Sequence, residues 1–257
     1  MNTHEKLVAL KTITTKEILR FSRIWIQTVL PPVITTALYF LIFGNLIGPR
    51  IGKMGGFDYM EFIIPGLIMM AVITNSYANV VSSFYGSKFQ RHIEEMIISP
   101  TPNYIILLGF VCGGVARGLT VGVAVTIVSL VFHPLNIHSL WIMFSMIILT
   151  AILFSLAGLI NGVYAKSFDD ISIIPTFVLT PLTYLGGIFY SINMLPEFWQ
   201  QLSLANPILY MVNAFRYGFL GVSDINLTTS YVIIFACICT LYIFSLYLLK
   251  KGHGVRT

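Results

Sequence analysis

The chain has 257 residues, of which 56% are apolar and only 10% are charged, and its mean hydropathy is +0.85. Soluble domains carry about 25% charged residues, so these values argue against a water-soluble enzyme. Low charge combined with 14% aromatic residues also excludes a disordered chain. We expect a polytopic membrane protein, and at about 20 residues per span the length allows roughly six crossings and no large globular domain.

The net charge of +5 is interpreted as loop charge that orients the spans rather than as a nucleic-acid site. The three cysteines, Cys112, Cys237 and Cys239, lie in apolar runs and are expected to be buried. Their spacing fits neither a metal site nor a disulfide framework.

Residues 5–25 are expected to form an amphipathic helix in the headgroup plane. Apolar residues recur at spacings of three and four from Leu7 to Trp25, while Lys16, Glu17 and Arg20 fall on the opposite side. A basic amphipathic helix directly before an apolar run is typical of an interfacial helix. The alternative is a helix that packs on soluble parts of a partner.

Six apolar segments follow, each long enough to cross about 30 Å of hydrocarbon. They cover residues 26–47, 60–84, 103–132, 140–164, 171–191 and 229–249. Pro175 and Pro181 predict a bent fifth span, and the acidic pair Asp169–Asp170 before it is expected to cap its N-terminus. Residues 194–221 contain two apolar pieces too short to cross, which predicts a pair of re-entrant half-helices.

The distribution of Lys and Arg predicts that both termini face the cytoplasm. With the N-terminus inside, three basic residues fall in outer segments: Arg50, Lys53 and Arg216. Eleven fall in inner segments: Lys6, Lys11, Lys16, Arg20, Arg23, Lys88, Arg91, Lys166, Lys250, Lys251 and Arg256.

Glycines recur every four residues in the third and fourth apolar segments. Small residues at this spacing let helix backbones approach closely in a membrane, so they predict packing within the bundle. The glycines are Gly109, Gly113, Gly114, Gly118, Gly122, Gly158 and Gly162.

The inner loop at 88–100 predicts a short amphipathic helix at the cytoplasmic surface. Phe89, Ile93 and Met96 share one face, and the helix should end before Pro100, because proline disfavours the helical conformation in the residue before it. This helix is either a docking element or a plain surface helix.

Four polar residues are predicted at membrane depth: Arg117, Asn75, Asn79 and Asn161. Arg117 lies well inside a span, at a cost of about 2.5–3.5 kcal/mol, and is either a functional site or a structural clamp. The three asparagines are expected to make hydrogen bonds between helices. The chain has no Walker pattern, nucleophile triad or metal-ligand spacing, so no catalytic, cofactor-binding or metal residues are predicted.

Over essentially its whole length the sequence resembles the ABC-2 type transport permeases. The most specific segments are 43–48 (FGNLIG), 65–70 (PGLIMM), 89–95 (FQRHIEE) with Pro100, 115–118 (VARG), and 181–187 (PLTYLGG) continued by Asn206–Pro207, Tyr210 and Arg216.

The resemblance implies an all-α membrane protein of the type V exporter fold, in a single domain. This fold has six transmembrane helices, an N-terminal interfacial helix and re-entrant half-helices between spans five and six. It also implies a homodimer in a bacterial inner membrane, docked on two copies of a separate ATPase that binds ATP and Mg. The expected partners are therefore that ATPase, a second copy and membrane lipids, with no nucleic acid.

By resemblance, the loop at 88–100 is the coupling helix that contacts the ATPase. Its polar contacts would be Arg91, Glu94 and Glu95, and its buried face Phe89, Ile93 and Met96. The interfacial helix would brace the same subunit through Lys16, Glu17 and Arg20. One departure is that His92–Ile93 stands where the family often has Gly-Thr.

The expected function is ATP-driven export of an amphipathic, lipid-like, glycan or drug-like substrate, with ATP hydrolysed by the partner. A secondary transporter or channel, or a membrane scaffold, is the alternative. The aromatic residues of a possible substrate path are Tyr39, Phe43, Tyr77, Phe177, Tyr184 and Phe189.

Overall fold

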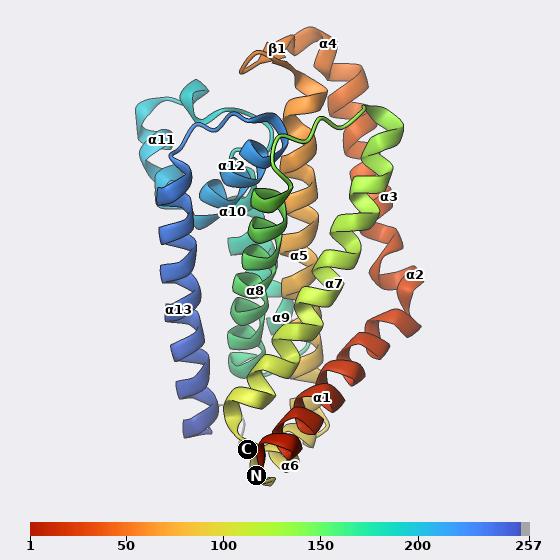
Figure 1. The fold of residues 1–257 in the computed structure, drawn as a ribbon, viewed down its shortest axis with the longest axis vertical. Helices are drawn as coiled ribbons and strands as arrows, with labels where there is room; N and C mark the ends of the chain where they lie inside the picture. The colour runs from red at the N-terminus through yellow and green to blue at the C-terminus, as the bar shows by residue number, and fades with distance from the viewer. Residues whose placement is uncertain (253–257) are drawn as a thin grey trace.

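The computed structural model describes residues 1–252 and is mostly helical. Four long helices run side by side along the length of the molecule (Figure 1): α5 (Tyr59–Phe89), α7 (Asn103–Phe132), α8 (Leu140–Tyr164) and α13 (Leu227–Lys251). The bounds of α7 and α8 match the apolar segments of the sequence. The start of α1 (Thr3–Arg23) and the end of α13 lie at the same end of the bundle (Figure 1). Arg256, counted among the inner charges, lies outside the described residues.

The first apolar segment is broken into short helical pieces after α1. They are α2 (Trp25–Thr28), α3 (Leu30–Tyr39), the π-helix η1 (Phe40–Ile47) and α4 (Gly48–Ile51). Pro31 and Pro32 cause part of this irregularity, because proline has no backbone N–H to donate to the preceding turn.

A two-stranded hairpin follows at the far end of the molecule and was not predicted for an all-α protein. Strands β1 (Lys53–Met54) and β2 (Phe57–Asp58) pair antiparallel. Gly55 and Gly56 connect them with φ values of 60° and 88°, which is the geometry of the tight turns that favour glycine at both central positions.

Helix α5 forms the centre of the bundle, and 83% of the residues in an apolar 18-residue stretch of it are buried. Glycines on the neighbouring helices allow them to approach it closely, as the sequence predicted. An added Cβ would overlap Val80 at Gly114, Ser76 at Gly118 and the carbonyl of Tyr77 at Gly158.

Among residues 1–252, five helical stretches are long and apolar enough to cross a membrane, counting α2 to α4 as one. The predicted span at 171–191 is not among them. It is helical through α9 (Asp170–Ile174), the π-helix η2 (Pro175–Leu179) and α10 (Thr180–Tyr184), and then turns at Gly187, where φ is 70°. Fifteen helical residues rise only about 22 Å, so this crossing stays a prediction.

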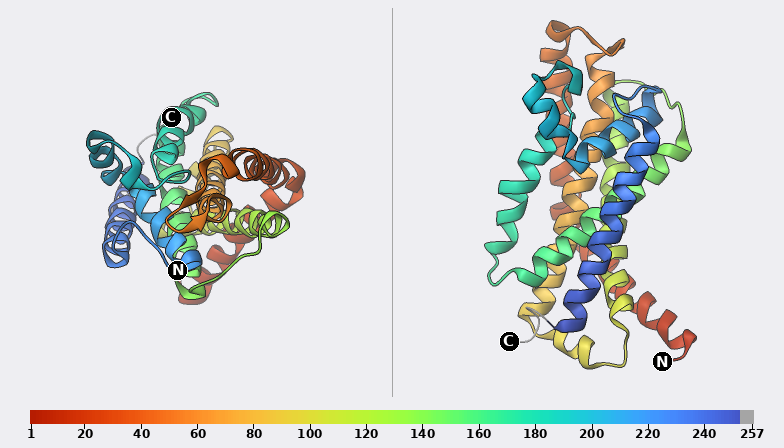
Figure 2. Two further views of the ribbon diagram at one scale, coloured as in Figure 1. Left: turned by 90° about the horizontal axis from the view of Figure 1, so that it is seen from above. Right: turned by 90° about the vertical axis from the view of Figure 1, so that its left-hand side faces the viewer.

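The segment at 194–221 does form two helices, α11 (Glu197–Leu204) and α12 (Pro207–Leu220), preceded by the short helix η3 (Ile192–Met194). Neither α11 nor α12 is long enough to cross a bilayer. Figure 2 shows this group at the same end of the molecule as the hairpin. The cysteines are free, as predicted, but Cys239 is exposed and Cys112 and Cys237 are only half-buried. Burial was therefore the wrong expectation.

Candidate functional site

Helix α6 (His92–Ile98) lies at the same end of the molecule as α1 (Figure 1). Arg91 makes the corner between α5 and α6 with a φ of 62°, the one positive value on a non-glycine residue in the described chain. Arg91 and Glu95 are exposed and Glu94 is half-buried. The charged side of the predicted coupling helix is therefore accessible at the tip of the molecule.

The apolar face predicted for this helix is divided by the structure. Ile93 is fully buried and Met96 packs beside it, both against the chain's own bundle. Phe89 is 66% exposed and Ile98 is 83% exposed. Ile93 is therefore covered by the chain itself, whereas the expected contacts of Phe89 and Met96 with the ATPase stay a prediction. Ile98, which sequence reasoning missed, is an exposed apolar group.

The corner between α5 and α6 is tied to the end of α8 by hydrogen bonds. The Lys88 ammonium donates to the carbonyls of Val163 and Ala165, each at 2.7 Å, and the Tyr85 hydroxyl donates to the carbonyl of Lys166 at 3.0 Å. The last carbonyls of a helix lack partners within the helix and favour a cation. Lys88 therefore fixes the position of the corner between α5 and α6 relative to α8.

Aromatic contacts with α5 and hydrogen bonds within the loop after α8 reinforce this connection between α5 and α8. The Phe168 ring lies 4.9 Å from the ring of Tyr85 and 5.3 Å from that of Phe89. Asp170 accepts hydrogen bonds from the backbone N–H groups of Lys166 and Ser167 at 2.8 and 3.1 Å. These bonds, the one from Lys166 first, hold the pKa of the Asp170 carboxyl below its usual value.

The capping expected from Asp169–Asp170 takes a different form. The side chain of Asp169, at the N-cap of α9, makes no capping hydrogen bond. The Asp170 carboxylate points backwards to the loop, and its own N–H donates to the Ser167 hydroxyl at 3.2 Å. The acidic residue therefore orders the connection from α8 to α9 rather than the helix that follows.

Glu17 of α1 is fully buried, contrary to the expectation that it braces a partner. Its carboxylate accepts from the Ser83 hydroxyl at 2.7 Å and pairs with Arg20 at 3.3 Å. Gly113 of α7 makes the room, since a Cβ there would overlap Glu17. Lys16 is exposed on the same helix, and its predicted role stays a prediction.

Three of the four polar residues predicted at membrane depth meet on one side of α5. The Arg20 guanidinium donates to the carbonyl and side-chain oxygens of Asn79, both at 2.8 Å. Arg117 donates to the Asn75 side-chain oxygen at 3.0 Å and to the Thr28 carbonyl at 3.5 Å. The sequence found Arg117 and both asparagines but missed Arg20 as their partner.

The contact between Arg117 and Thr28 follows from the prolines in the first segment. Pro32 has no N–H, so the carbonyl of Thr28 four residues earlier loses its helical donor. A guanidinium nitrogen takes its place. These contacts are those of the structural clamp that the sequence left open as an alternative.

Four of the six predicted path aromatics gather into one cluster, which we call the aromatic face: Tyr39, Phe43, Tyr184 and Phe189. The Phe189 ring lies 5.1 Å from Phe43, 5.9 Å from Tyr39 and 6.0 Å from Tyr184. The hydroxyls of Tyr39 and Tyr184 are 3.4 Å apart. The cluster joins the first apolar segment to the end of α10.

The remaining two aromatics lie elsewhere. Tyr77 is only 2% exposed inside α5, whereas Phe177 is 74% exposed on η2. Arg216, placed by the sequence in an outer segment, is fully buried in α12 with its guanidinium 3.9 Å above the Phe62 ring, and it donates to the carbonyl of Gly187. The turn after α10 therefore depends on a buried cation.

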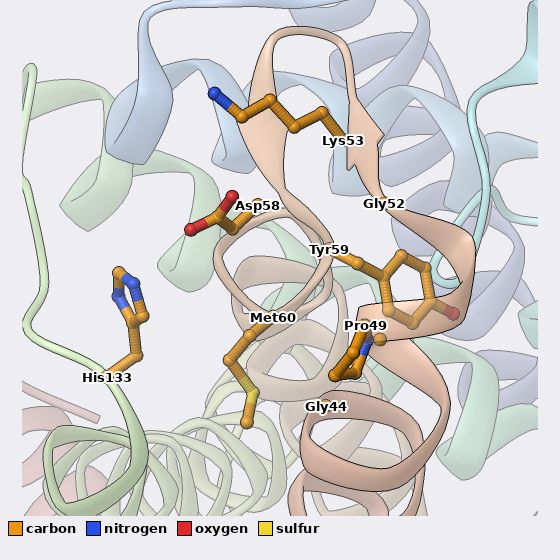
Figure 3. Close-up of a pocket in the computed structure, with 9 residues that line it drawn as sticks. Gly44, Pro49, Gly52, Lys53, Asp58, Tyr59, Met60 and His133 are labelled. Atoms are coloured by element: carbon orange, nitrogen blue, oxygen red, sulfur yellow. The ribbon is translucent and has the colours of Figure 1, made fainter.

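An open pocket of about 400 Å³ lies beside the hairpin, at the end of the molecule opposite α6 (Figures 1 and 3). Asp58 and His133 face its opening and Met60 extends toward Gly44 at its base. Within residues 1–252 no three His, Cys, Asp or Glu side chains lie together as a metal site requires. The pocket was not anticipated from the sequence.

Comparison with known proteins gives one family and two groups of relatives. The family described as ABC-2 type transporter matches residues 8–220. The chain is 60% identical over 255 residues to the inner membrane transport permease YadH of Escherichia coli strain K12, covering 99% of each protein. It is 24% identical over 193 residues to nodulation protein J of Neorhizobium galegae, covering 74% of each.

The identity to an inner membrane permease and the five long apolar helices agree on location. The chain is a multi-pass protein of the inner membrane.

Proposed function

Because the chain belongs to the ABC-2 type transporter family, we propose that it is the permease subunit of an exporter driven by a separate ATP-hydrolysing subunit. In this proposal the chain crosses the membrane six times. The fifth crossing includes α9 to α10, and α11 and α12 enter the outer leaflet without crossing. The charge distribution of the sequence supports cytoplasmic termini.

The observation that carries the proposal is the accessible coupling end. The proposed ATPase contacts are the exposed Arg91 and Glu95, with the exposed apolar side chains of Phe89 and Ile98 as anchors. Lys88 and Phe168 connect the same corner to the end of α8 and to the loop that leads into α9. A push on α6 would therefore reach the fifth crossing as well as α5.

The proposed transport path lies at the aromatic face between two copies of the chain. Aromatic side chains offer apolar area together with hydroxyl groups, which suits an amphipathic cargo. The cargo proposed is amphipathic, lipid-like, glycan or drug-like. ATP binding in the partner would draw two coupling helices together and open the path between the subunits.

Purification from the native bacterium tests the ATPase partner. We expect a tagged chain to co-purify with an ATPase that carries a Walker motif, and Arg91→Glu or Glu95→Lys to remove that ATPase while leaving the permease folded. Lys53→Glu, at the outer end, is the matched charge reversal and should keep the ATPase.

Retention of the ATPase by both coupling-helix variants would contradict docking at α6. The absence of any ATPase from the intact complex would favour a transporter or scaffold that works alone. Stimulation of ATP hydrolysis in liposomes by candidate amphipathic substrates would then separate a transporter from a scaffold.

A further inference from the structure

The junction of α1, α5 and α7 contains more positive than negative charge. Arg20 and Arg117 contribute two guanidinium groups, and Glu17 contributes one carboxylate, which pairs with Arg20. The hydrogen bonds of Arg117 go to neutral oxygens of Asn75 and Thr28. A partly buried cation without a counter-charge is costly, so the site favours one further anion.

The two guanidinium groups bind asparagines on adjacent turns of α5. Arg117 bonds Asn75 and Arg20 bonds Asn79, and residues four apart on a helix have Cβ atoms about 5–6 Å apart. Two side chains from different helices, α1 and α7, are thus brought together by α5. Like charges this close repel each other unless an anion lies between or beside them.

The guanidinium groups still have donors to offer. The Arg117 Nε is buried without a hydrogen-bond partner. Within residues 1–252, neither Arg117 nor Arg20 donates a hydrogen bond through its Nη1 atom. The Arg20 side chain is 29% exposed and Arg117 is half-buried. The site is therefore reachable from outside the bundle.

The surrounding residues place this site at the level of the lipid headgroups. Trp25, directly after α1, is 56% exposed, and its neighbours Ile24 and Ile26 are 42% and 58% exposed. Tryptophan is enriched at the boundary between lipid and water. Figure 1 shows α1 meeting the bundle obliquely and the chain turning at α2. We call this bend between α1 and α2 the elbow.

We propose that the elbow between α1 and α2 binds the phosphate group of an anionic phospholipid, held by Arg117 and Arg20. Guanidinium groups bind phosphate through paired, charge-assisted hydrogen bonds. The lipid supplies the missing negative charge and fastens α1 to α5 and α7. The proposal depends on membrane location and not on the proposed ATPase.

The test measures retained lipid in the purified full-length protein. Protein from nanodiscs of phosphatidylglycerol or of phosphatidylcholine is released into detergent and examined by native mass spectrometry. We expect one tightly retained phosphatidylglycerol in the unaltered chain, and its loss in Arg117→Gln and in Arg20→Gln. Arg50→Gln, an exposed arginine at the other end of the molecule, should retain it.

Two further arms separate the outcomes. Glu17→Gln removes the carboxylate and leaves both cations, so this variant should retain phosphatidylglycerol more strongly. Its result tests the proposal even if an arginine variant fails to fold. Unchanged retention in Arg20→Gln and Glu17→Gln overturns the proposal. Equal thermal stabilisation by millimolar inorganic phosphate without lipid also overturns it, because the site would then bind free phosphate.

Discussion

Two glycines of α7 decide how α1 meets the bundle. Ile13, Glu17 and Phe21 are the buried residues of α1, and they lie on one stripe at a spacing of four. Gly109 and Gly113 of α7 face Ile13 and Glu17 at the same spacing. Because neither glycine has a side chain, a carboxylate can enter a helix interface and reach Ser83 behind it.

Replacing Gly113 by valine is expected to destabilise the protein. The new side chain would overlap Glu17 and push α1 outward, and overpacking of this kind costs about 1–3 kcal/mol. Gly86→Ala is the matched control, since nothing lies within 4 Å of the added Cβ and alanine is the better helix former. Thermal unfolding in detergent should show a lower midpoint for the first variant and an equal or higher midpoint for the second.

Arg91 offers a second test at the scale of one residue. Its left-handed conformation costs a non-glycine residue roughly 1–2 kcal/mol. Arg91→Gly and Arg91→Ala remove the same charge, but only glycine relieves the backbone. We expect the glycine variant to be the more stable of the two by about 1 kcal/mol, as measured by thermal unfolding. Equal stabilities would mean that the corner relaxes in the variants.

At the scale of elements, the loop between α8 and α9 connects the corner between α5 and α6 to the fifth predicted span. Lys88 of α5 donates to the carbonyls at its start, the Phe168 ring within the loop contacts Phe89 of α5 edge-on, and Asp170 orders the loop backbone. The hydrophobic pattern could not reveal this, because the contacts are made by an ammonium with backbone carbonyls. Such partners have no signature in the sequence.

Lys88→Met is expected to loosen this connection. It leaves two buried carbonyls without a donor, at a cost of about 1–3 kcal/mol. Hydrogen exchange of the segment 163–170 should increase in this variant and stay unchanged in Lys166→Met, because the neighbouring Lys166 side chain is exposed. Faster exchange in both variants would assign the effect to net charge instead.

At the scale of the whole molecule, the sequence predicts the long helices well and the short ones poorly. The bounds of α7 and α8 follow from apolar length, since neither helix contains a proline and Arg117 is the one charged residue within them. The end of α10 at Tyr184 depends on a glycine turn and on Arg216 beneath it. The burial of Glu17 depends on a glycine in another helix, which periodicity within α1 cannot report.

The aromatic face and the exposed side of η2 also lead to an expectation about assembly. Phe177→Cys, in a chain whose three native cysteines are replaced by alanine, should form a cross-linked dimer under oxidation in membranes. A chain that keeps only Cys239, on α13 at the opposite edge of the bundle from α3 (Figure 1), should not. Cross-linking through Cys239 alone would place the contact between copies on α13.

The hairpin of β1 and β2 has a practical consequence. Lys53 is exposed on a short, tightly turned strand beyond the last apolar residues of its segment, so a cysteine there leaves the bundle undisturbed. A maleimide that cannot pass the membrane should label this cysteine in intact spheroplasts if the termini are cytoplasmic, and only after lysis if they are not. The smallest element of the molecule thus becomes a reporter for the direction in which the chain is inserted.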